Sequence, residues 1–305
     1  MKPLRTARLA SRVLGPWALL ALGACATNEA EDPSDWYDGG TDLYVEEPVA
    51  FTDQNYAFPV DDDDGIGFLK DNLLPVPSGS PGADQVAWGK DDAYVDPPGG
   101  PMRSPGCQIL PVDELPFVID GVATAFPRFY FKTSGCDWDS DEKYYGSFFI
   151  QDRTGGLFVL GDTKVAHFEM GDRIRIRARA AKTSFDLDMI YAYDQLEVVE
   201  KGVPIYYEEA HEELDTLAAD PSTNPIGKVY RVTGEVITGM DTFGEFTVED
   251  DDGDRFVVGL DVELSRRGAE YPMGTRVTAT GPILYSYSVY KIVIMRKGQI
   301  TVHTD

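Results

Sequence analysis

The chain has 305 residues, of which 52 are Asp or Glu and 27 are Lys or Arg, so its formal net charge is −25. This length suits two ordinary domains, and 43% hydrophobic residues with 11% aromatics can build real cores, which excludes a wholly disordered chain. The acidic balance argues against a polyanionic partner. With three His and three Cys, the chain has too few ligands for multi-metal clusters or a cysteine-rich scaffold.

Residues 1–24 have the pattern of a secretory signal peptide. Their charged residues are all basic, and the mostly apolar run 13–22 that follows them is too short to span a bilayer. The basic residues are Lys2, Arg5, Arg8 and Arg12. The sequence therefore predicts export from the cytoplasm.

The signal ends in Leu22-Gly23-Ala24-Cys25, which resembles the lipobox of bacterial lipoproteins. The alternative is an ordinary signal peptide with a chance cysteine. The resemblance implies diacylglycerol and an N-acyl chain on Cys25, and more than one buried chain gives stable anchoring. By analogy with lipoprotein sorting, the absence of Asp after the cysteine implies the outer membrane of a Gram-negative bacterium.

The segment 25–105 is predicted to be an acidic tether rich in Pro and Gly. Residues 26–105 contain 18 acids and three bases, and such self-repulsion favours an extended chain. A solvated tether needs no aromatic residues, yet Phe51, Tyr56 and Phe58 are among several in this segment. The sequence leaves open whether some of them dock on the folded body.

Beyond the tether the chain repeats itself. Residues 148–160 align without gaps onto 246–258 at an offset of 98, and each copy is typical of two strands joined by an Asp- and Gly-containing turn. Upstream, Gly121 matches Gly234. Downstream, Met170-Gly171 matches Met273-Gly274. The first copy carries about 15 extra residues before its hairpin.

A first strand with an early Gly, a hairpin, a connector and two closing strands resemble the five-stranded OB-fold barrel. The pattern is similar to OB-fold domains of secreted and cell-envelope bacterial proteins, including those appended to extracellular nucleases. We therefore expect a mainly β protein with OB-fold-like domains at 106–200 and 228–305. Between them, in the linker 201–227, the apolar spacing of 206–218 predicts a short helix.

Cys107 and Cys136 remain once Cys25 carries lipid. In an oxidising envelope this even pair favours a disulfide. The alternative, a reactive thiol, needs an activating His or helix terminus, and the neighbouring sequence supplies neither.

Two groups of residues are candidates for a ligand face. Arg173, Arg175, Arg177 and Arg179 alternate with apolar residues, which places four guanidinium groups on one face of a strand, where they could grip an anion or pair with carboxylates of the protein. The extra residues of the first copy supply aromatics that could stack on a ligand or close the barrel. These aromatics include Tyr130, Trp138, Tyr144 and Tyr145.

The acidic turn 249–254 has an alternating spacing of Asp but departs from a calcium loop, because the Gly and Glu positions of that motif are Arg255 and Asp261. We find no catalytic motif and expect neither a metal nor a cofactor. The leading interpretation is a non-enzymatic, lipid-anchored envelope protein that binds a protein or a glycan through tandem OB-fold domains. The alternative is an oligonucleotide-binding or nuclease-associated module.

Overall fold

A computed structural model describes residues 49–60, 65–72, 107–109, 118–125, 129–134, 141–160, 168–184, 187–219, 224–266 and 268–304. These residues belong to one compact unit, 41–305. The chain is mainly β, as expected, and its described α-helices are short: α1 (Ile66–Asn72), α2 (Leu214–Ala219) and α3 (Val262–Arg266). No helix in these ranges is long and apolar enough to cross a membrane. The predicted signal peptide and Cys25 lie outside the described residues.

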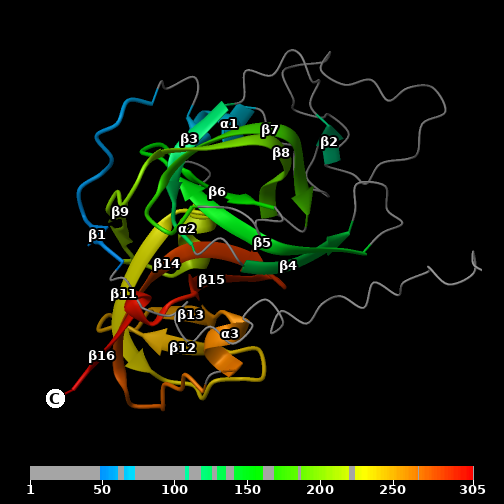
Figure 1. Cartoon of the computed structure of the whole chain (residues 1–305). Coiled ribbons are helices and arrows are strands. Elements are labelled where there is room, and N and C mark those ends of the chain that lie inside the picture. The colour runs from blue at the N-terminus through cyan, green and yellow to red at the C-terminus, as the bar shows by residue number, and fades with distance from the viewer. Residues whose placement is uncertain are drawn as a thin grey trace, which may run out of the picture. The chain divides into compact units, whose positions relative to one another are not determined.

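The first sheet contains five strands that pair in a closed cycle (Figure 1). The first strand pairs with the second, the second with the third, the third in parallel with the fifth, the fifth with the fourth, and the fourth with the first. Two further strands, β2 (Cys107–Ile109) and β4 (Phe129–Ser134), pair with the cycle from outside. The cycle comprises β3 (Val118–Ala123), β5 (Asp141–Gln151), β6 (Gly156–Val159), β7 (Arg173–Ser184) and β8 (Leu187–Glu200).

The second sheet repeats this connectivity, with the same parallel pairing of its third and fifth strands. Outside the cycle, β16 (Ile300–His303) follows the 3₁₀-helix η3 (Lys297–Gln299) and pairs with the fourth strand, while β10 (Glu208–Glu209) pairs in parallel with the first. The cycle comprises β11 (Val229–Val236), β12 (Glu245–Glu249), β13 (Arg255–Leu260), β14 (Arg276–Ser286) and β15 (Val289–Ile294).

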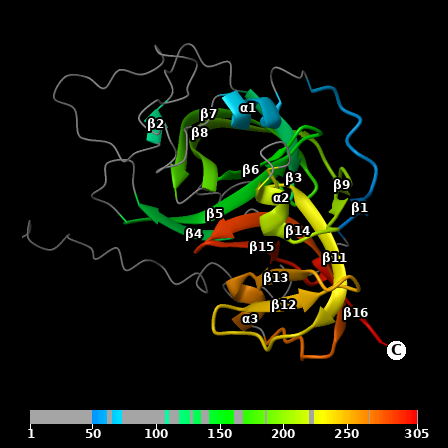
Figure 2. The same ribbon diagram turned by 180° about the vertical axis from the view of Figure 1, so that it is seen from behind.

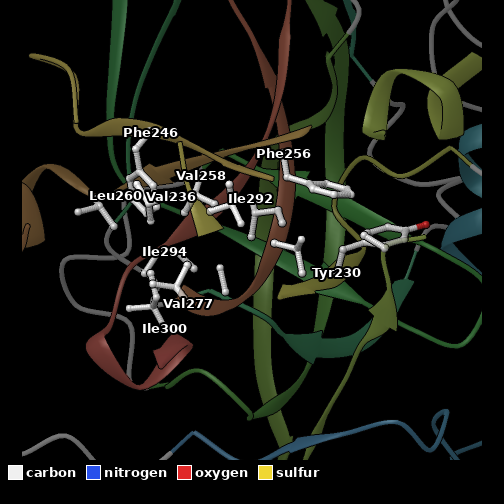
Figure 3. Close-up of a cluster of buried hydrophobic side chains, with 14 of the residues drawn as sticks. Tyr230, Val236, Phe246, Phe256, Val258, Leu260, Val277, Ile292, Ile294 and Ile300 are labelled. Carbon is white, nitrogen blue, oxygen red and sulfur yellow. The ribbon is translucent and has the colours of Figure 1, made fainter. Parts of the chain in front are cut away.

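Each sheet encloses its own apolar core, because alternate side chains of a strand point to the same face. In the second sheet the inward positions of all five strands meet in one buried cluster (Figure 3). Its members include Val236, Phe246, Val258, Val277 and Ile292. In the first sheet the corresponding cluster includes Phe148, Ile150, Leu157, Ile174 and Ile190.

Two glycine matches in the sequence repeat have a structural cause. A β-carbon on Gly121 would lie 2.8 Å from the carbonyl oxygen of Gln151, and one on Gly234 would lie still closer to that of Glu249. Both glycines therefore sit where the first strand of a sheet meets the end of the second, and only glycine allows this approach.

The Met-Gly match precedes the fourth strand of each sheet. Gly171 and Gly274 both have positive φ, at 92° and 83°. Their backbone N–H groups donate to the carbonyl oxygens of Ala123 and Val236, at 2.8 and 2.9 Å. Because Ala123 and Val236 are the last residues of β3 and β11, each glycine ties the connector to the end of the first strand.

The two predicted hairpins are confirmed, but they differ by one residue. The first runs from Gln151 to its partner Gly156, whereas the second runs from Glu249 to its partner Arg255. The second turn is thus one residue longer. The gapless alignment at an offset of 98 holds only up to the turn.

The extra turn residue changes which side chains are equivalent beyond it. The alignment matches Phe158 with Phe256, but Phe256 lies in the core of its sheet while Phe158 lies in a cluster between the two sheets. Leu157 holds the core position instead. A shift of one residue along a strand moves every side chain to the opposite face, so one added residue is sufficient for this exchange.

The region predicted to be a tether contains two stretches that pack on the folded body. We call residues 49–60 and 65–72 the N-terminal strap. Its strand β1 (Phe51–Thr52) pairs in parallel with β9 (Ile205–Tyr206), and Tyr56 is buried against Val122, Ile205 and Val229. The prediction of an extended tether is therefore wrong for these residues, and the open question about docked aromatics is answered for Tyr56.

Helix α1 of the strap and helix α2 of the linker each contribute apolar residues to the core of one sheet. Ile66 and Leu69 of α1 are buried in the core of the first sheet, while Leu214 of α2 is buried in the core of the second, with Leu217 packed against it. Each helix precedes the first strand of its sheet and offers apolar residues three positions apart. The repeated unit is therefore a helix followed by five strands.

The predicted linker helix is shorter than the expected 206–218. Helix α2 begins at Leu214, because residues 205–206 pair with the strap and residues 208–209 pair with Tyr230 and Arg231 of β11. These tertiary strand pairings outweigh the helical spacing of the first eight residues.

Candidate binding face

The arginines of β7 are engaged by groups of the protein itself. Asp120 of β3 accepts hydrogen bonds from Arg173 Nε at 2.6 Å and from Arg175 at 2.7 Å. The ring of Phe58, from the strap, lies 4.2 Å from the guanidinium carbon of Arg173. Arg177 continues the strand opposite Val118 and Gln195. Arg173 and Arg175 thus take the structural alternative, pairing with a carboxylate.

The extra residues of the first copy form a hairpin that lengthens β5. Strand β4 pairs with the first half of β5, which places Tyr130 opposite Tyr145 and Phe131 opposite Tyr144 in backbone register. Trp138 and Cys136 lie outside the described residues. The ligand-face role of these aromatics and the disulfide between Cys107 and Cys136 remain predictions.

Part of the outer face of the first sheet, on its second, third and fifth strands, packs against the second sheet. A buried apolar group, here called the sheet-to-sheet cluster, joins Phe149, Phe158 and Met189 of the first sheet to Leu284 and Val293 of the second. The rings of Phe149 and Phe158 lie 4.8 Å apart. Phe149 and Phe158 are fully buried in this contact and do not face solvent.

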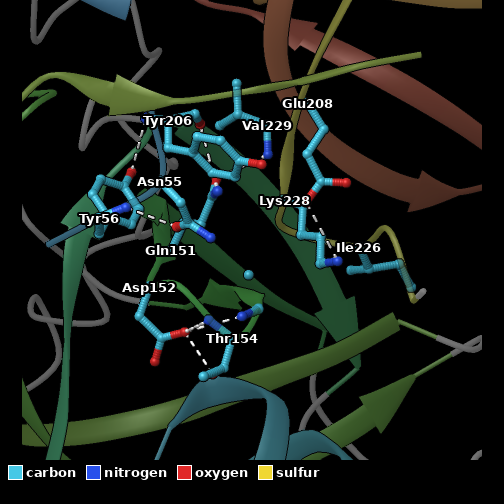
Figure 4. Close-up of polar contacts among 12 residues, drawn as sticks. Asn55, Tyr56, Gln151, Asp152, Thr154, Tyr206, Glu208, Ile226, Lys228 and Val229 are labelled. Carbon is cyan, nitrogen blue, oxygen red and sulfur yellow. Dashed lines mark hydrogen bonds and ion pairs between the residues drawn. The ribbon is translucent and has the colours of Figure 1, made fainter. Parts of the chain in front are cut away.

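Buried polar groups fix the same junction (Figure 4). The Oε1 atom of Gln151 accepts a hydrogen bond of 2.9 Å from the backbone N–H of Val229, the first residue of β11. Lys70 of the strap donates to the carbonyl oxygens of Gly156 and Ile226, at 3.1 and 2.8 Å. The strap therefore bridges the first sheet and the chain that enters the second.

The matching outer face of the second sheet, here called the open face, is partly exposed and carries paired charges. Glu245 of β12 accepts a hydrogen bond from Lys291 of β15, and Glu249 forms an ion pair with Arg255 at 2.9 Å. Basic groups elsewhere on this sheet are also paired, as in the contact of 2.8 Å between Arg276 and Asp251. These pairs leave little uncompensated positive charge for a polyanion.

Two exposed aromatic side chains border this open face. Phe243 is 78% exposed in the loop before β12, and Tyr287 is 95% exposed in the turn between β14 and β15. The two loops lie at opposite ends of the strands, because β12 begins beside Gly259 and β15 begins beside the start of β13. In OB-folds the loops after the first and fourth strands and the face of the second and third strands contact the ligand.

The turn that carries Tyr287 has an unusual backbone. Ser286 pairs with Val289, which leaves Tyr287 and Ser288 as a two-residue loop with φ angles of 53° and 63°. Positive φ at both positions defines the turn type that usually selects Asn-Gly. A tyrosine held there is strained, and strained residues cluster at functional sites.

In the acidic turn 250–254, the first carboxylate accepts hydrogen bonds from the backbone of the turn itself. Asp250 Oδ1 accepts hydrogen bonds from the N–H groups of Asp252 and Asp254, at 3.0 and 2.9 Å. Desolvation, followed by the charge of Asp250, raises the pKa of Asp254. Within the described residues, no group of three or more His, Cys, Asp or Glu side chains is placed to hold a metal ion.

Sequence reasoning placed the candidate ligand face on the first copy and assigned neither exposed aromatic of the second sheet to it. The available signal was the segment 285–290, Tyr-Ser-Tyr-Ser-Val-Tyr, which combines aromatic and small hydroxyl residues at a hairpin turn. That composition is typical of recognition loops. The extra aromatics of the first copy drew the prediction to the other sheet.

Comparison with known proteins gives no family for this chain. No protein-family model and no curated protein matches it. Among solved structures it is similar to a murine DNA-binding protein bound to double-stranded DNA, at 12% identity and a TM-score of 0.30, covering 61% of this chain and 97% of that one.

Two other similar structures contain single-stranded DNA-binding proteins. One is a replication protein A heterotrimer bound to ssDNA, at 14% identity and a TM-score of 0.28, covering 64% of this chain and 51% of that one. The other is the single-stranded DNA-binding protein of Thermus aquaticus, at 10% identity and a TM-score of 0.21, covering 61% and 91%.

Proposed function

We propose that this protein is a non-enzymatic, lipid-anchored cell-envelope protein whose two closed strand cycles are tandem OB-fold barrels acting as one binding body. The observation that carries the proposal is the sheet-to-sheet cluster. It uses part of the outer face of the first barrel for packing, through Phe149 and Phe158, and we expect the ligand on the matching face of the second barrel. Anchoring through Cys25 would hold this face at the outer membrane.

The charge distribution supports a ligand other than nucleic acid. The chain carries −25, and Arg173, Arg175, Arg255 and Arg276 each form an ion pair with a carboxylate. Nucleic-acid affinity depends on free Lys and Arg that neutralise phosphates. A protein or a glycan of the cell envelope is the partner that we propose.

A second candidate is an oligonucleotide-binding module. The exposure of Phe243 and Tyr287, on the two loops that contact ligands in OB-folds, favours it. Aromatic side chains stack on bases regardless of sequence. The acidic surroundings of the open face weigh against this candidate.

Fluorescence anisotropy with a single-stranded oligonucleotide, recorded with the full chain in detergent at two salt concentrations, separates the candidates. The proposal expects no binding at physiological salt, since like charges repel at range. Sub-micromolar affinity that falls steeply with added salt would establish the oligonucleotide-binding module instead.

A further inference from the structure

The turn between β14 and β15 carries a side chain that folding does not require. Tyr287 is 95% exposed and has a φ of 53°, a conformation that Asn or Gly adopts at lower cost. A large aromatic at such a position gains no burial from folding. Its ring is therefore accessible to a molecule outside the described fold.

The base beneath Tyr287 is rigid and aromatic. Tyr285 and Tyr290 are cross-strand partners, and their ring centroids lie 4.5 Å apart. Both rings also pack against the sheet-to-sheet cluster, which anchors this hairpin on the junction of the two sheets. In Figures 1 and 2 the hairpin runs beside β4 and β5, the strands lengthened by the extra residues of the first copy.

The tip is uncharged although the chain is strongly acidic. Residues 281–290, Gly-Pro-Ile-Leu-Tyr-Ser-Tyr-Ser-Val-Tyr, contain no ionisable acid or base other than tyrosine. Lys291, directly after this run, donates to Glu245. The tip thus presents aromatic faces and hydroxyl groups and no charged side chain of its own.

We infer that the tip formed by Tyr285, Tyr287 and Tyr290 binds a neutral oligosaccharide. This inference rests on the proposed function and names its ligand class. The face of a sugar ring is apolar and stacks on an aromatic side chain, while its hydroxyls bond to Ser and Tyr hydroxyls. A protein partner needs roughly 800 Å² on each side, more than a two-residue turn supplies. A nucleic acid needs cations that the tip lacks.

The test is a glycan array with neutral and anionic oligosaccharides, probed with the labelled full chain in detergent. We expect signal on neutral glycans that hardly changes with salt. Tyr287→Asn suits the positive φ of the turn and should weaken the signal by about tenfold. Tyr287→Phe keeps the stacking face and should stay within about threefold of the parent.

Met273→Ala is the matched control, because Met273 is also a large exposed apolar side chain of the second sheet, at 67%, but precedes the start of β14 whereas Tyr287 follows its end. It should leave the signal unchanged. A thermal melt and a circular dichroism spectrum of each variant verify that it is folded.

The possible outcomes separate the two proposals. Neutral-glycan binding that survives Tyr287→Asn, or that Met273→Ala abolishes, overturns the assignment of the ligand to the tyrosine tip while leaving the proposal of a binding protein in place. A blank array, or signal on anionic glycans alone, overturns the ligand class. A blank array combined with salt-sensitive binding of single-stranded DNA overturns the proposed function as well.

Discussion

The Oδ2 atom of Asp152 accepts a hydrogen bond of 2.8 Å from the backbone N–H of Ile66, so a hairpin turn of the first sheet holds a helix that lies 86 positions earlier in the chain. The other oxygen, Oδ1, accepts from the N–H groups of Thr154 and Gly155, at 2.7 and 2.9 Å. One buried carboxylate thereby organises its own turn and attaches the strap. The strap is consequently part of the cooperative fold.

Replacing Asp152 with Asn should destabilise the protein by about 1–3 kcal/mol, because the new amide NH₂ would face the donor at Ile66 and leave it unpaired. Chemical denaturation gives the free energy of unfolding. Protease cleavage within 49–72 should also become faster.

The matched control for this change is Asp250→Asn in the second hairpin. Asp250 Oδ1 accepts two N–H groups of its own turn, and an Asn oxygen can do the same. We expect a change below about 0.5 kcal/mol there. Equal losses at both positions would contradict the role assigned to the bond between Asp152 and Ile66.

Stability should fall at alkaline pH because of Tyr56. Burial raises the pKa of the Tyr56 phenol above its ordinary value of 10, so the folded state keeps the proton while the unfolded state loses it. The stability is fully present below about pH 10 and decreases above it, by at most about 1.4 kcal/mol per pH unit for this group.

Urea unfolding between pH 8 and about 11.5 measures this dependence. Tyr56→Phe should flatten the alkaline decline, although the variant loses the hydrogen bond of 3.2 Å that the hydroxyl accepts from the Tyr206 N–H. An unchanged alkaline slope in the variant would show that other groups control it.

The double change Tyr287→Asn and Ser288→Gly should stabilise the protein by about 1 kcal/mol, because it places the preferred pair in a turn with two positive φ angles. The melting temperature should rise by roughly 2–4 °C. A lower melting temperature would mean that Tyr287 supports the fold, and its exposure would then need another explanation.

Cys25→Ser should yield an unlipidated precursor, because lipid attachment and lipoprotein-type cleavage both require the thiol of Cys25. Metabolic labelling with a radioactive fatty acid measures this directly. Label on the variant at the parent level would place the anchor elsewhere in the chain.

The pair Cys107 and Cys136 is expected to contain no free thiol in the unreduced protein. Alkylation followed by intact mass measurement should give no adduct on these residues before reduction and two adducts after it. An adduct without reduction would rule out the disulfide.

The sequence was sufficient to predict the elements that depend on local patterns. Alternation of apolar residues and Asp-Gly turns predicted both hairpins, and the paired glycines at 121 and 234 marked equivalent backbone contacts. These features repeat because the first strand makes the same close approach to the end of the second strand in both sheets. Local rules therefore recovered the mainly β class and the repeat.

The sequence could not predict what depends on distant partners. The composition of the strap is that of a solvated segment. Gly67 nevertheless packs so closely against Thr154 that a β-carbon on Gly67 would lie 2.8 Å from the backbone oxygen of Thr154. The packing of the two sheets on each other was not predictable for a related reason. Whether Phe158 packs inward or against the other sheet depends on a single turn residue, which an alignment without gaps does not reveal.

The docking of the strap also sets how far the binding body can travel from its anchor. With the whole segment 26–105 free, the 80 residues after Cys25 could reach roughly 280 Å at full extension. Because Phe51 pairs with Ile205, the folded body instead begins near Val49, and 23 residues between Cys25 and Val49 can reach at most about 80 Å. For a lipidated chain, the strap confines the tyrosine tip to ligands close to its own membrane and excludes capture across a wide compartment.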